Sequence, residues 1–264
     1  MDKSEGKHFV LVHGACHGAW CWYKVASLLK SAGHKVTVLD LAASGIHPKQ
    51  LHEVKSLSEY LEPSMEFMAS PALTEEKVVL VGHSNGGLCI SVAMEKFPER
   101  VSVAVYATAV MPGPDLSILT LGEEVFNRRL DSYMDTQFTF DQGENNPPTS
   151  LLWGPNVMPS QFYQLSPPED LTLAMSLVRP IRLFRDSSTL QKEANLSREK
   201  YGQVPRVYII CQKDNIMKED FQRWMIENNP APEVKVIADS DHMVMFSQPK
   251  ELCSYLLEIA EKYS

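Results

Sequence analysis

The stretch from residue 78 to residue 91 constrains the fold more than any other part of the chain. An apolar run at 78–81 leads into Gly82-His83-Ser84-Asn85-Gly86, and a segment that can form a helix follows. A G-x-S-x-G sequence between a buried strand and a helix is typical of a nucleophile elbow, a sharp turn with the serine at its tip. The flanking glycines let strand and helix backbones approach closely. We therefore predict that Ser84 is a nucleophile exposed at the carboxyl end of a strand.

Strand-like and helix-like segments alternate on both sides of this turn. Runs rich in strand-forming residues occur at 8–13, 36–40, 77–81, 101–107, 206–211 and 234–237, and helical patterns occur at 20–31, 58–69, 218–227 and 250–262. Such alternation predicts an α/β protein whose mostly parallel central sheet carries helices on both faces. The 264 residues suffice for one domain, 1–264, with ligands bound beyond the carboxyl ends of the strands.

The region 111–180 lacks this alternation. It contains nine of the 17 prolines and seven aromatic residues: Phe126, Tyr133, Phe138, Phe140, Trp153, Phe162 and Tyr163. A Pro-rich, aromatic-rich insertion between two sheet strands suits a lid, or cap, that supplies apolar walls to a binding site. The alternative is an ordinary irregular subdomain packed on the core. We predict a lid, because the region follows soon after the elbow.

Composition and charge exclude several kinds of partner. The net charge is −8 and the sequence pI about 5.5, with basic residues scattered along the chain, so nucleic acid and acidic membrane surfaces are poor partners. The charged N-terminus is followed only by a strand-length apolar run, and no transmembrane run occurs. The five cysteines lie mostly in apolar contexts, as reduced thiols do. We predict a cytoplasmic location.

A serine hydroxyl needs a base within hydrogen-bond reach and a group that orients the base. In proteins with this elbow the acid and then the histidine follow the serine along the chain. His242 is the only one of the eight histidines after Ser84, and it lies just past the last predicted strand. Asp214 lies just past the preceding one, and 242 − 214 = 28 residues leave room for a helix and a strand. We predict the catalytic triad Ser84, Asp214 and His242.

Three other aspartates compete for the role of the acid. Asp220 falls on a predicted helix, whereas Asp239 and Asp241 are too close to His242 in sequence to reach the far nitrogen of its ring. We interpret Asp239 and Asp241 as solvated loop charges.

An oxyanion hole requires two backbone N–H groups that face the developing negative charge. We predict that Asn85, directly after the nucleophile, and Ala15, in the loop after the first strand, supply them. His13 and His17 in that loop are a possible metal pair, but no carboxylate or second ligand pair lies near them in the sequence. We predict no metal and no cofactor.

Several stretches together are more specific than any single motif. They are residues 7–20 (KHFVLVHGACHGAW), 33–37 (GHKVT), 40–45 (DLAASG), 82–84 (GHS), 166–171 (SPPEDL) and 241–243 (DHM). On these residues the chain resembles, over essentially its whole length, the plant methylesterase and hydroxynitrile lyase family of α/β-hydrolases. Methyl salicylate and methyl jasmonate esterases, polyneuridine aldehyde esterase and methylketone synthases belong to that group. The resemblance implies an α/β-hydrolase fold and a possible homodimer.

Individual positions separate the reactions found in this family. Its hydroxynitrile lyases carry threonine after the first-strand histidine and lysine after the catalytic histidine, where this chain has Gly14 and Met243. Without the lysine's charge a departing cyanide is not stabilised. The methylketone synthases replace the nucleophile and the acid, whereas Ser84 and Asp214 are present here. The resemblance therefore favours ester hydrolysis.

The resemblance also indicates which residues surround the substrate: Gly14, His17, Phe126, Tyr133 and Met243. Phe126 and Tyr133 differ from the residues associated with salicylate specificity, so the acyl group stays open. Asn85 stands at a position that is usually apolar in the esterases, which places an amide beside the oxyanion hole.

We predict a serine carboxylesterase that hydrolyses small methyl esters of plant hormones or specialised metabolites through an acyl-enzyme. Two alternatives stay open. One is hydroxynitrile lyase or 3-keto acid decarboxylase activity in the same pocket. The other is a non-catalytic small-molecule receptor on the same fold, because a fold does not fix a function.

Overall fold

The computed structural model describes residues 6–73, 76–129 and 133–263. Its centre is a six-stranded sheet in the order β2-β1-β3-β4-β8-β9, and every neighbouring pair of strands is parallel. The strands are β1 His8–Val12, β2 Lys35–Leu39, β3 Val78–Ser84, β4 Val101–Ala109, β8 Arg206–Cys211 and β9 Glu233–Ile237. The predicted α/β architecture with a parallel sheet is therefore confirmed.

The strand order reverses in the middle of this sheet. The chain passes from β1 outward to β2 and then returns to β3 on the other side of β1, so that Phe9 pairs with both Val36 and Val79. In open α/β sheets the crevice for a ligand lies at this reversal, beyond the carboxyl ends of the strands. The fold thus directs the ends of β1 and β3 toward the site.

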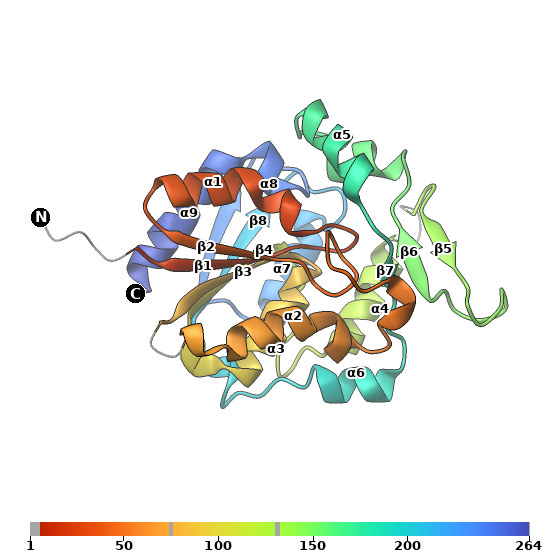
Figure 1. Cartoon of the computed structure of the whole chain (residues 1–264), viewed down its shortest axis with the longest axis horizontal. Helices are drawn as coiled ribbons and strands as arrows, with labels where there is room; N and C mark the ends of the chain where they lie inside the picture. The colour runs from red at the N-terminus through yellow and green to blue at the C-terminus, as the bar shows by residue number, and fades with distance from the viewer. Residues whose placement is uncertain (1–5, 74–75, 130–132, 264) are drawn as a thin grey trace, which may run out of the picture.

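Helices cover both faces of the sheet (Figure 1). The helices α1 (Tyr23–Ser31) and α9 (Pro249–Lys262) pack together on one face, and α2 (Leu57–Ala69) and α3 (Gly86–Lys96) on the other. This double cover explains why β1 is buried along its whole length and why its sequence is apolar from Phe9 to Val12. The remaining helix of the sheet layers, α7 (Glu219–Asn228), packs beside β8.

Shorter helical segments connect these elements. They are η1 Ala19–Trp22, η2 Leu51–Glu53, η3 Pro71–Leu73, η4 Pro98–Arg100, η5 Met158–Phe162, η6 Tyr201–Gln203 and α8 Val244–Ser247.

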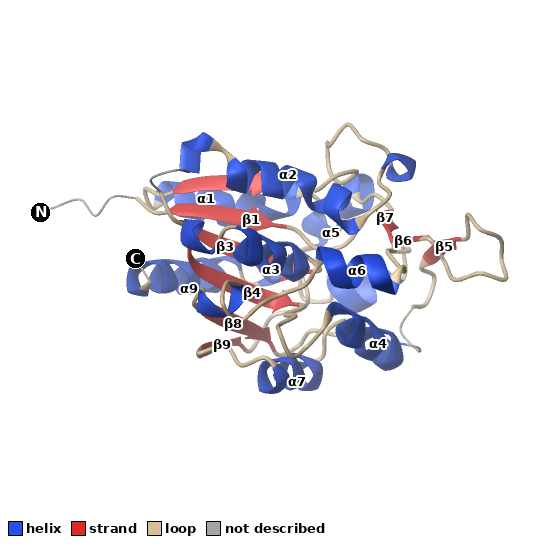
Figure 2. Cartoon of the chain, turned by 90° about the horizontal axis from the view of Figure 1, so that it is seen from below, coloured by secondary structure: helices blue, strands red, loops and turns tan. Residues whose placement is uncertain are grey.

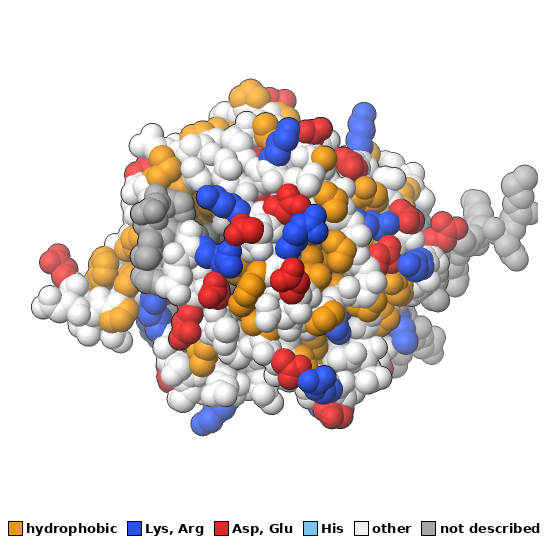
Figure 3. All heavy atoms as spheres, turned by 180° about the vertical axis from the view of Figure 1, so that it is seen from behind, with side chains coloured by type: hydrophobic (Ala, Val, Ile, Leu, Met, Phe, Trp, Pro, Cys, Tyr) orange, Lys and Arg blue, Asp and Glu red, His pale blue; other side chains and the backbone are white. Residues whose placement is uncertain are grey.

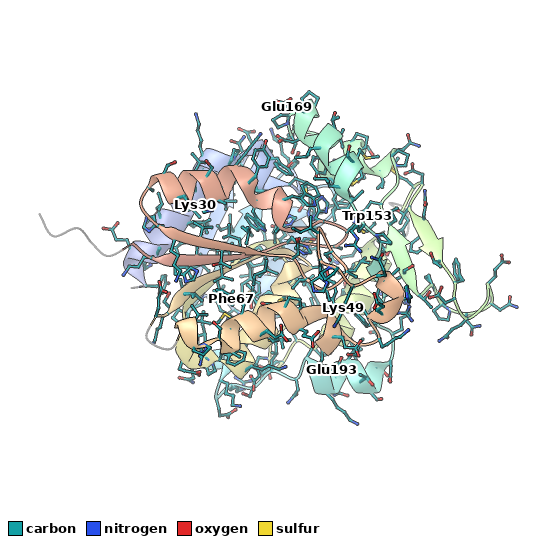
Figure 4. All side chains as sticks on the ribbon, viewed as in Figure 1. Lys30, Lys49, Phe67, Trp153, Glu169 and Glu193 are labelled. Carbon is teal, nitrogen blue, oxygen red and sulfur yellow. The ribbon has the colours of Figure 1, made fainter. Side chains whose placement is uncertain are left out.

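The chain between β4 and β8 forms a separate layer of elements at one end of the sheet (Figure 2). Besides η5 and η6, its described elements are the helices α4 Ile118–Arg129, α5 Pro168–Leu177 and α6 Ser187–Glu193 and an antiparallel sheet of β5 Gln137–Thr139, β6 Ser150–Leu152 and β7 Ile181–Arg182. The irregular region predicted at 111–180 thus has regular structure of its own, and the same layer continues through β7 and α6. Trp153, labelled in Figure 4, lies where this small sheet faces the main sheet.

The surface carries charges of both signs. On the face shown in Figure 3, acidic and basic side chains alternate without a large patch of one sign. Among the described helices none combines the length and the apolarity that a bilayer crossing requires. All five cysteines are buried and free.

Candidate active site

Ser84 ends β3 on a sharp turn that leads directly into α3. Its φ is +52°, in the left-handed region that ordinary residues rarely adopt. The turn depends on Gly86, because a Cβ there would lie 2.7 Å from the carbonyl oxygens of both Val12 and His13. The backbone of β1 therefore passes directly against the start of α3. This is the geometry predicted from the G-x-S-x-G sequence, with strain concentrated at the serine.

The structure brings the three predicted triad residues together in one chain of hydrogen bonds. The Oγ of Ser84 lies 3.0 Å from Nε2 of His242, and Nδ1 of His242 lies 2.7 Å from Oδ2 of Asp214. Because an ionised carboxylate only accepts, the proton of the neutral ring resides on Nδ1, which leaves Nε2 free to accept from Ser84. His242 and Asp214 are buried, at 1% and 3% exposure.

Asp214 is fixed by three further donors. Its Oδ1 accepts the backbone N–H groups of Ile216 and Met217, at 2.7 and 2.8 Å. Its Oδ2 also accepts the hydroxyl of Thr108, at 2.6 Å, from the end of β4. These three hydrogen bonds hold the carboxylate in place independently of its hydrogen bond with His242. Thr108 was not predicted as part of the site, since nothing in a β-branched strand marks one threonine as a partner of a residue 106 positions away.

His83 supports His242 from the opposite side. Its Nε2–H donates to the backbone carbonyl of His242 at 2.7 Å, and the two ring centroids are 4.7 Å apart. Burial, reinforced by the closeness of His242, holds the pKa of His83 well below its usual range, so its ring is neutral. The Nδ1 of His83 has no partner among the described residues. The G-x-S-x-G motif leaves the residue at position 83 unspecified, so the sequence alone assigned no role to His83.

The prediction that Asp241 is a solvated loop charge is wrong. Asp241 is fully buried and accepts the N–H of Leu165 at 2.9 Å, the hydroxyl of Ser166 at 2.8 Å and the N–H of Met243 at 3.0 Å. Burial raises the pKa of this carboxyl. Asp241 therefore ties the loop of His242 to the segment before α5. That tie depends on long-range contacts, which its place in a polar loop does not reveal.

The other two competing aspartates lie on the surface, as the sequence indicated. Asp239 pairs with Lys213 at 2.6 Å, and Asp220 on α7 pairs with Arg128 at 2.7 Å. Neither contacts His242 in the described structure.

A cavity of about 880 Å³ lies beside Ser84 and His242. Its walls are mainly apolar and come from α2, α3, α4, α6 and η5, from the residue after β4, and from the segments around β6 and β7. They include Leu57, Leu88, Val110, Leu119, Leu121, Val125, Leu151, Trp153, Phe162, Ile181, Leu183, Phe184 and Leu190. Phe162 also sets its ring edge-on to His242, with the centroids 5.2 Å apart. The size and the apolar lining are those of a small-molecule site.

Most of the predicted binding residues line this cavity. Gly14, His17 and Tyr133 are in its wall. A Cβ on Gly14 would lie 2.7 Å from the Cβ of Ser84, so a larger residue at this position would collide with the nucleophile. Met243 is fully buried and lies outside the cavity lining. The side chain of Phe126, on α4, falls outside the described residues.

The two predicted oxyanion donors also lie in the cavity wall. Ala15 follows β1 and Asn85 follows Ser84, and both line the cavity beside the nucleophile. The described structure records no hydrogen bond from the backbone N–H of either residue to another residue. Both donors are therefore available to a bound oxygen.

Two buried histidines hold the loop that contains Ala15. The ring of His13 donates from Nδ1 to the carbonyl of Gly14 at 2.8 Å and accepts the N–H of Leu41 at Nε2. His17 donates from Nδ1 to the carbonyl of Ala15 at 2.9 Å and accepts the hydroxyl of Tyr163 at Nε2, at 2.7 Å. Burial lowers the pKa of His17 to about 3 and also lowers that of His13.

Both histidines are therefore neutral, and their ring nitrogens are fully used. Among the described residues, no three His, Cys, Asp or Glu side chains gather as a metal site.

Comparisons with known proteins place this geometry among relatives. Residues 9–254 match the Alpha/beta hydrolase family. The chain is 61% identical to Methyl jasmonate esterase 1 of Vitis vinifera, covering all of both chains. It is 47% identical to Salicylic acid-binding protein 2 of Nicotiana tabacum, covering 98% of this chain and 99% of the other. A crystal structure of tomato Methylketone Synthase I is similar with a TM-score of 0.93 and 49% identity, over 98% of both chains.

Proposed function

Because the chain belongs to the alpha/beta hydrolase family and is a carboxylic ester hydrolase within it, we propose that it hydrolyses small methyl esters of plant hormones or specialised metabolites. One observation carries the proposal: a hydrogen-bonded serine, histidine and aspartate meet at an apolar cavity of about 880 Å³.

In the proposed mechanism Ser84 attacks the ester carbonyl while Nε2 of His242 takes its proton. The N–H groups of Ala15 and Asn85 hold the oxyanion, a contribution of order 10² to 10³ in rate per donor in other enzymes. His242 then gives the proton to the leaving methanol, and Asp214 keeps the ring in the required tautomer. Water, activated by the same histidine, hydrolyses the acyl-enzyme and returns Ser84.

The substrate class follows from the cavity and the relatives. An apolar wall broken by few polar groups suits the acyl part of a lipophilic acid, and methanol is the small leaving group. The named relatives include a methyl jasmonate esterase and a salicylic acid-binding protein, which supports acids of plant hormone size. The cavity volume of about 880 Å³ admits more than one acyl group of this size.

Gly14 and Met243 argue against the lyase alternative. Gly14 lacks the side chain that threonine supplies in the lyases, and Met243 supplies no positive charge for a departing cyanide. The intact hydrogen-bonded triad argues against a non-catalytic receptor, since a receptor does not require an activated serine.

The proposal includes the setting of the enzyme. Region 111–180 acts as a lid, because Tyr133, Trp153 and Phe162 from it line the cavity. We propose a cytoplasmic location, because all five cysteines are free. The named relatives support a role in specialised metabolism. It acts on a small-molecule ester, and a homodimer is the proposed assembly.

Steady-state hydrolysis tests the proposal. Methyl salicylate, methyl jasmonate, methyl indole-3-acetate and p-nitrophenyl acetate are compared on the wild type and on Ser84→Ala. We expect turnover of at least one methyl ester that disappears in Ser84→Ala, with the melting temperature retained. Equal turnover by Ser84→Ala would overturn the mechanism. Absence of both turnover and covalent labelling of Ser84 by a fluorophosphonate would favour the receptor.

A further inference from the structure

The amide of Asn85 is an unpartnered polar group beside the nucleophile. Asn85 directly follows Ser84, lines the cavity and is half-buried. Its side chain neither caps α3 nor makes a hydrogen bond with any described residue. The carbonyl of Asn85 does accept the N–H of Leu88 at 3.1 Å, which fixes its backbone at the start of the helix. The amide is therefore held near Ser84 while its donor and acceptor stay available.

Binding of a purely apolar acyl group beside this amide costs free energy, because the walls around the amide are apolar. Leu88, Val110 and Phe162 line the same cavity, and an apolar acyl group that fills it would displace water from the amide. A covered amide without a partner costs far more than an exposed one. Sites built to hydrogen-bond a substrate oxygen reject the analogue that lacks it for this reason. The side chain thus favours substrates that replace the lost water.

We propose that Asn85 selects esters whose acyl group carries a hydroxyl or keto oxygen one or two carbons from the ester carbonyl. This inference rests on the proposed function, because it assumes that the ester carbonyl sits at Ser84 with its oxygen toward the N–H of Asn85. The side chain of the same residue reaches only a few ångströms farther, so its partner lies close to that carbonyl. A hydroxyl there bonds either end of the amide.

The cavity offers a matched control for this residue. Asn127 is the other amide side chain among the described residues of the cavity wall, and it lies exposed on α4 rather than on the turn that carries Ser84. The change of asparagine to leucine can therefore be made at both positions. Only the change at position 85 removes an amide next to the nucleophile.

The test uses three esters that differ by one hydroxyl: methyl hexanoate, methyl 2-hydroxyhexanoate and methyl 3-hydroxyhexanoate, the last two as single enantiomers of each hand. The kcat/KM of each hydroxylated ester is divided by that of methyl hexanoate, for the wild type, Asn85→Leu and Asn127→Leu. Differences in intrinsic reactivity cancel when these ratios are compared between enzymes. Asn85→Ala repeats the measurement without adding apolar bulk, and melting temperatures show that each variant is folded.

We expect Asn85→Leu and Asn85→Ala to lower the ratio for at least one hydroxylated ester by roughly ten-fold or more, and Asn127→Leu to leave it as in the wild type. Ratios in both position-85 variants equal to the wild-type ratio would overturn the inference while the esterase stands. An equal fall in Asn127→Leu would also overturn it. Absence of Ser84-dependent hydrolysis of all methyl esters would instead refute the proposed function.

Discussion

Replacing Asp214 by asparagine tests the triad at the residue that orients the base. The Oδ1 of Asp214 accepts two backbone N–H groups, from Ile216 and Met217, and this pair holds the side chain in one orientation. An asparagine keeps its oxygen on these donors, so its NH₂ group takes the place of Oδ2 and faces Nδ1 of His242. Because an amide nitrogen donates and does not accept, the proton of the ring moves to Nε2. His242 then cannot take the proton of Ser84.

The expected loss in turnover is large. Selecting the wrong tautomer lowers kcat about 10⁴-fold in a serine protease triad, which corresponds to about 5 kcal/mol in the barrier. The fold should survive, since the two backbone bonds to Oδ1 persist. Loss of the charge on the acceptor weakens them and costs about 1–3 kcal/mol in the free energy of unfolding, less than a typical domain possesses.

The assay is kcat and KM for p-nitrophenyl acetate and the best methyl ester, together with urea unfolding. Thr108→Val is the matched control, because it removes one hydrogen bond to Oδ2 but leaves the charged acceptor for His242. We expect this control to retain activity within about ten-fold of the wild type. Near-wild-type turnover in Asp214→Asn, or an equal loss in Thr108→Val, would refute the role of Asp214 as the group that orients His242.

Two further predictions concern the buried histidines. His83→Phe removes the donor to the carbonyl of His242 and should lower kcat on the order of ten- to a hundred-fold with little change in KM. His83→Gln keeps an N–H near the position of Nε2 and should recover most of the lost kcat. Equal losses of kcat in the two variants would contradict a positioning role. The folded state favours neutral His17, with its pKa of about 3 against an ordinary 6.5, so the free energy of unfolding should fall as the pH drops from 6.5 toward 3. At pH 4.5 the free energy of unfolding should be about 3 kcal/mol lower because of His17 than at neutral pH. In His17→Gln, urea unfolding should therefore show a weaker dependence of this free energy on pH. The same pH dependence in the variant and the wild type would contradict the prediction.

The elbow and the parallel strands were predicted from the sequence because each depends on a pattern of neighbouring residues. The elbow needs glycine at fixed places around Ser84, and the parallel strands need continuous apolar runs, so both can be read from neighbouring residues. The order of the triad members along the chain follows from the fold, which identified Asp214 and His242. In contrast, the helices and short strands between β4 and β8 have weak periodicity and frequent prolines. Their arrangement depends on packing against the sheet rather than on local pattern.

Asp241 and His83 illustrate why the rest of the site was not predictable. Both flank a triad residue in sequence, yet Asp241 bonds to Leu165, 76 residues away, and His83 to the backbone of His242, 159 residues away. A polar residue next to a catalytic one has the same local context whether it is solvated or buried with partners. Asn85 is different, because the elbow fixes where its side chain begins and the cavity fixes what surrounds it. Selectivity at this residue is therefore the part of substrate choice that depends least on how the region between β4 and β8 packs.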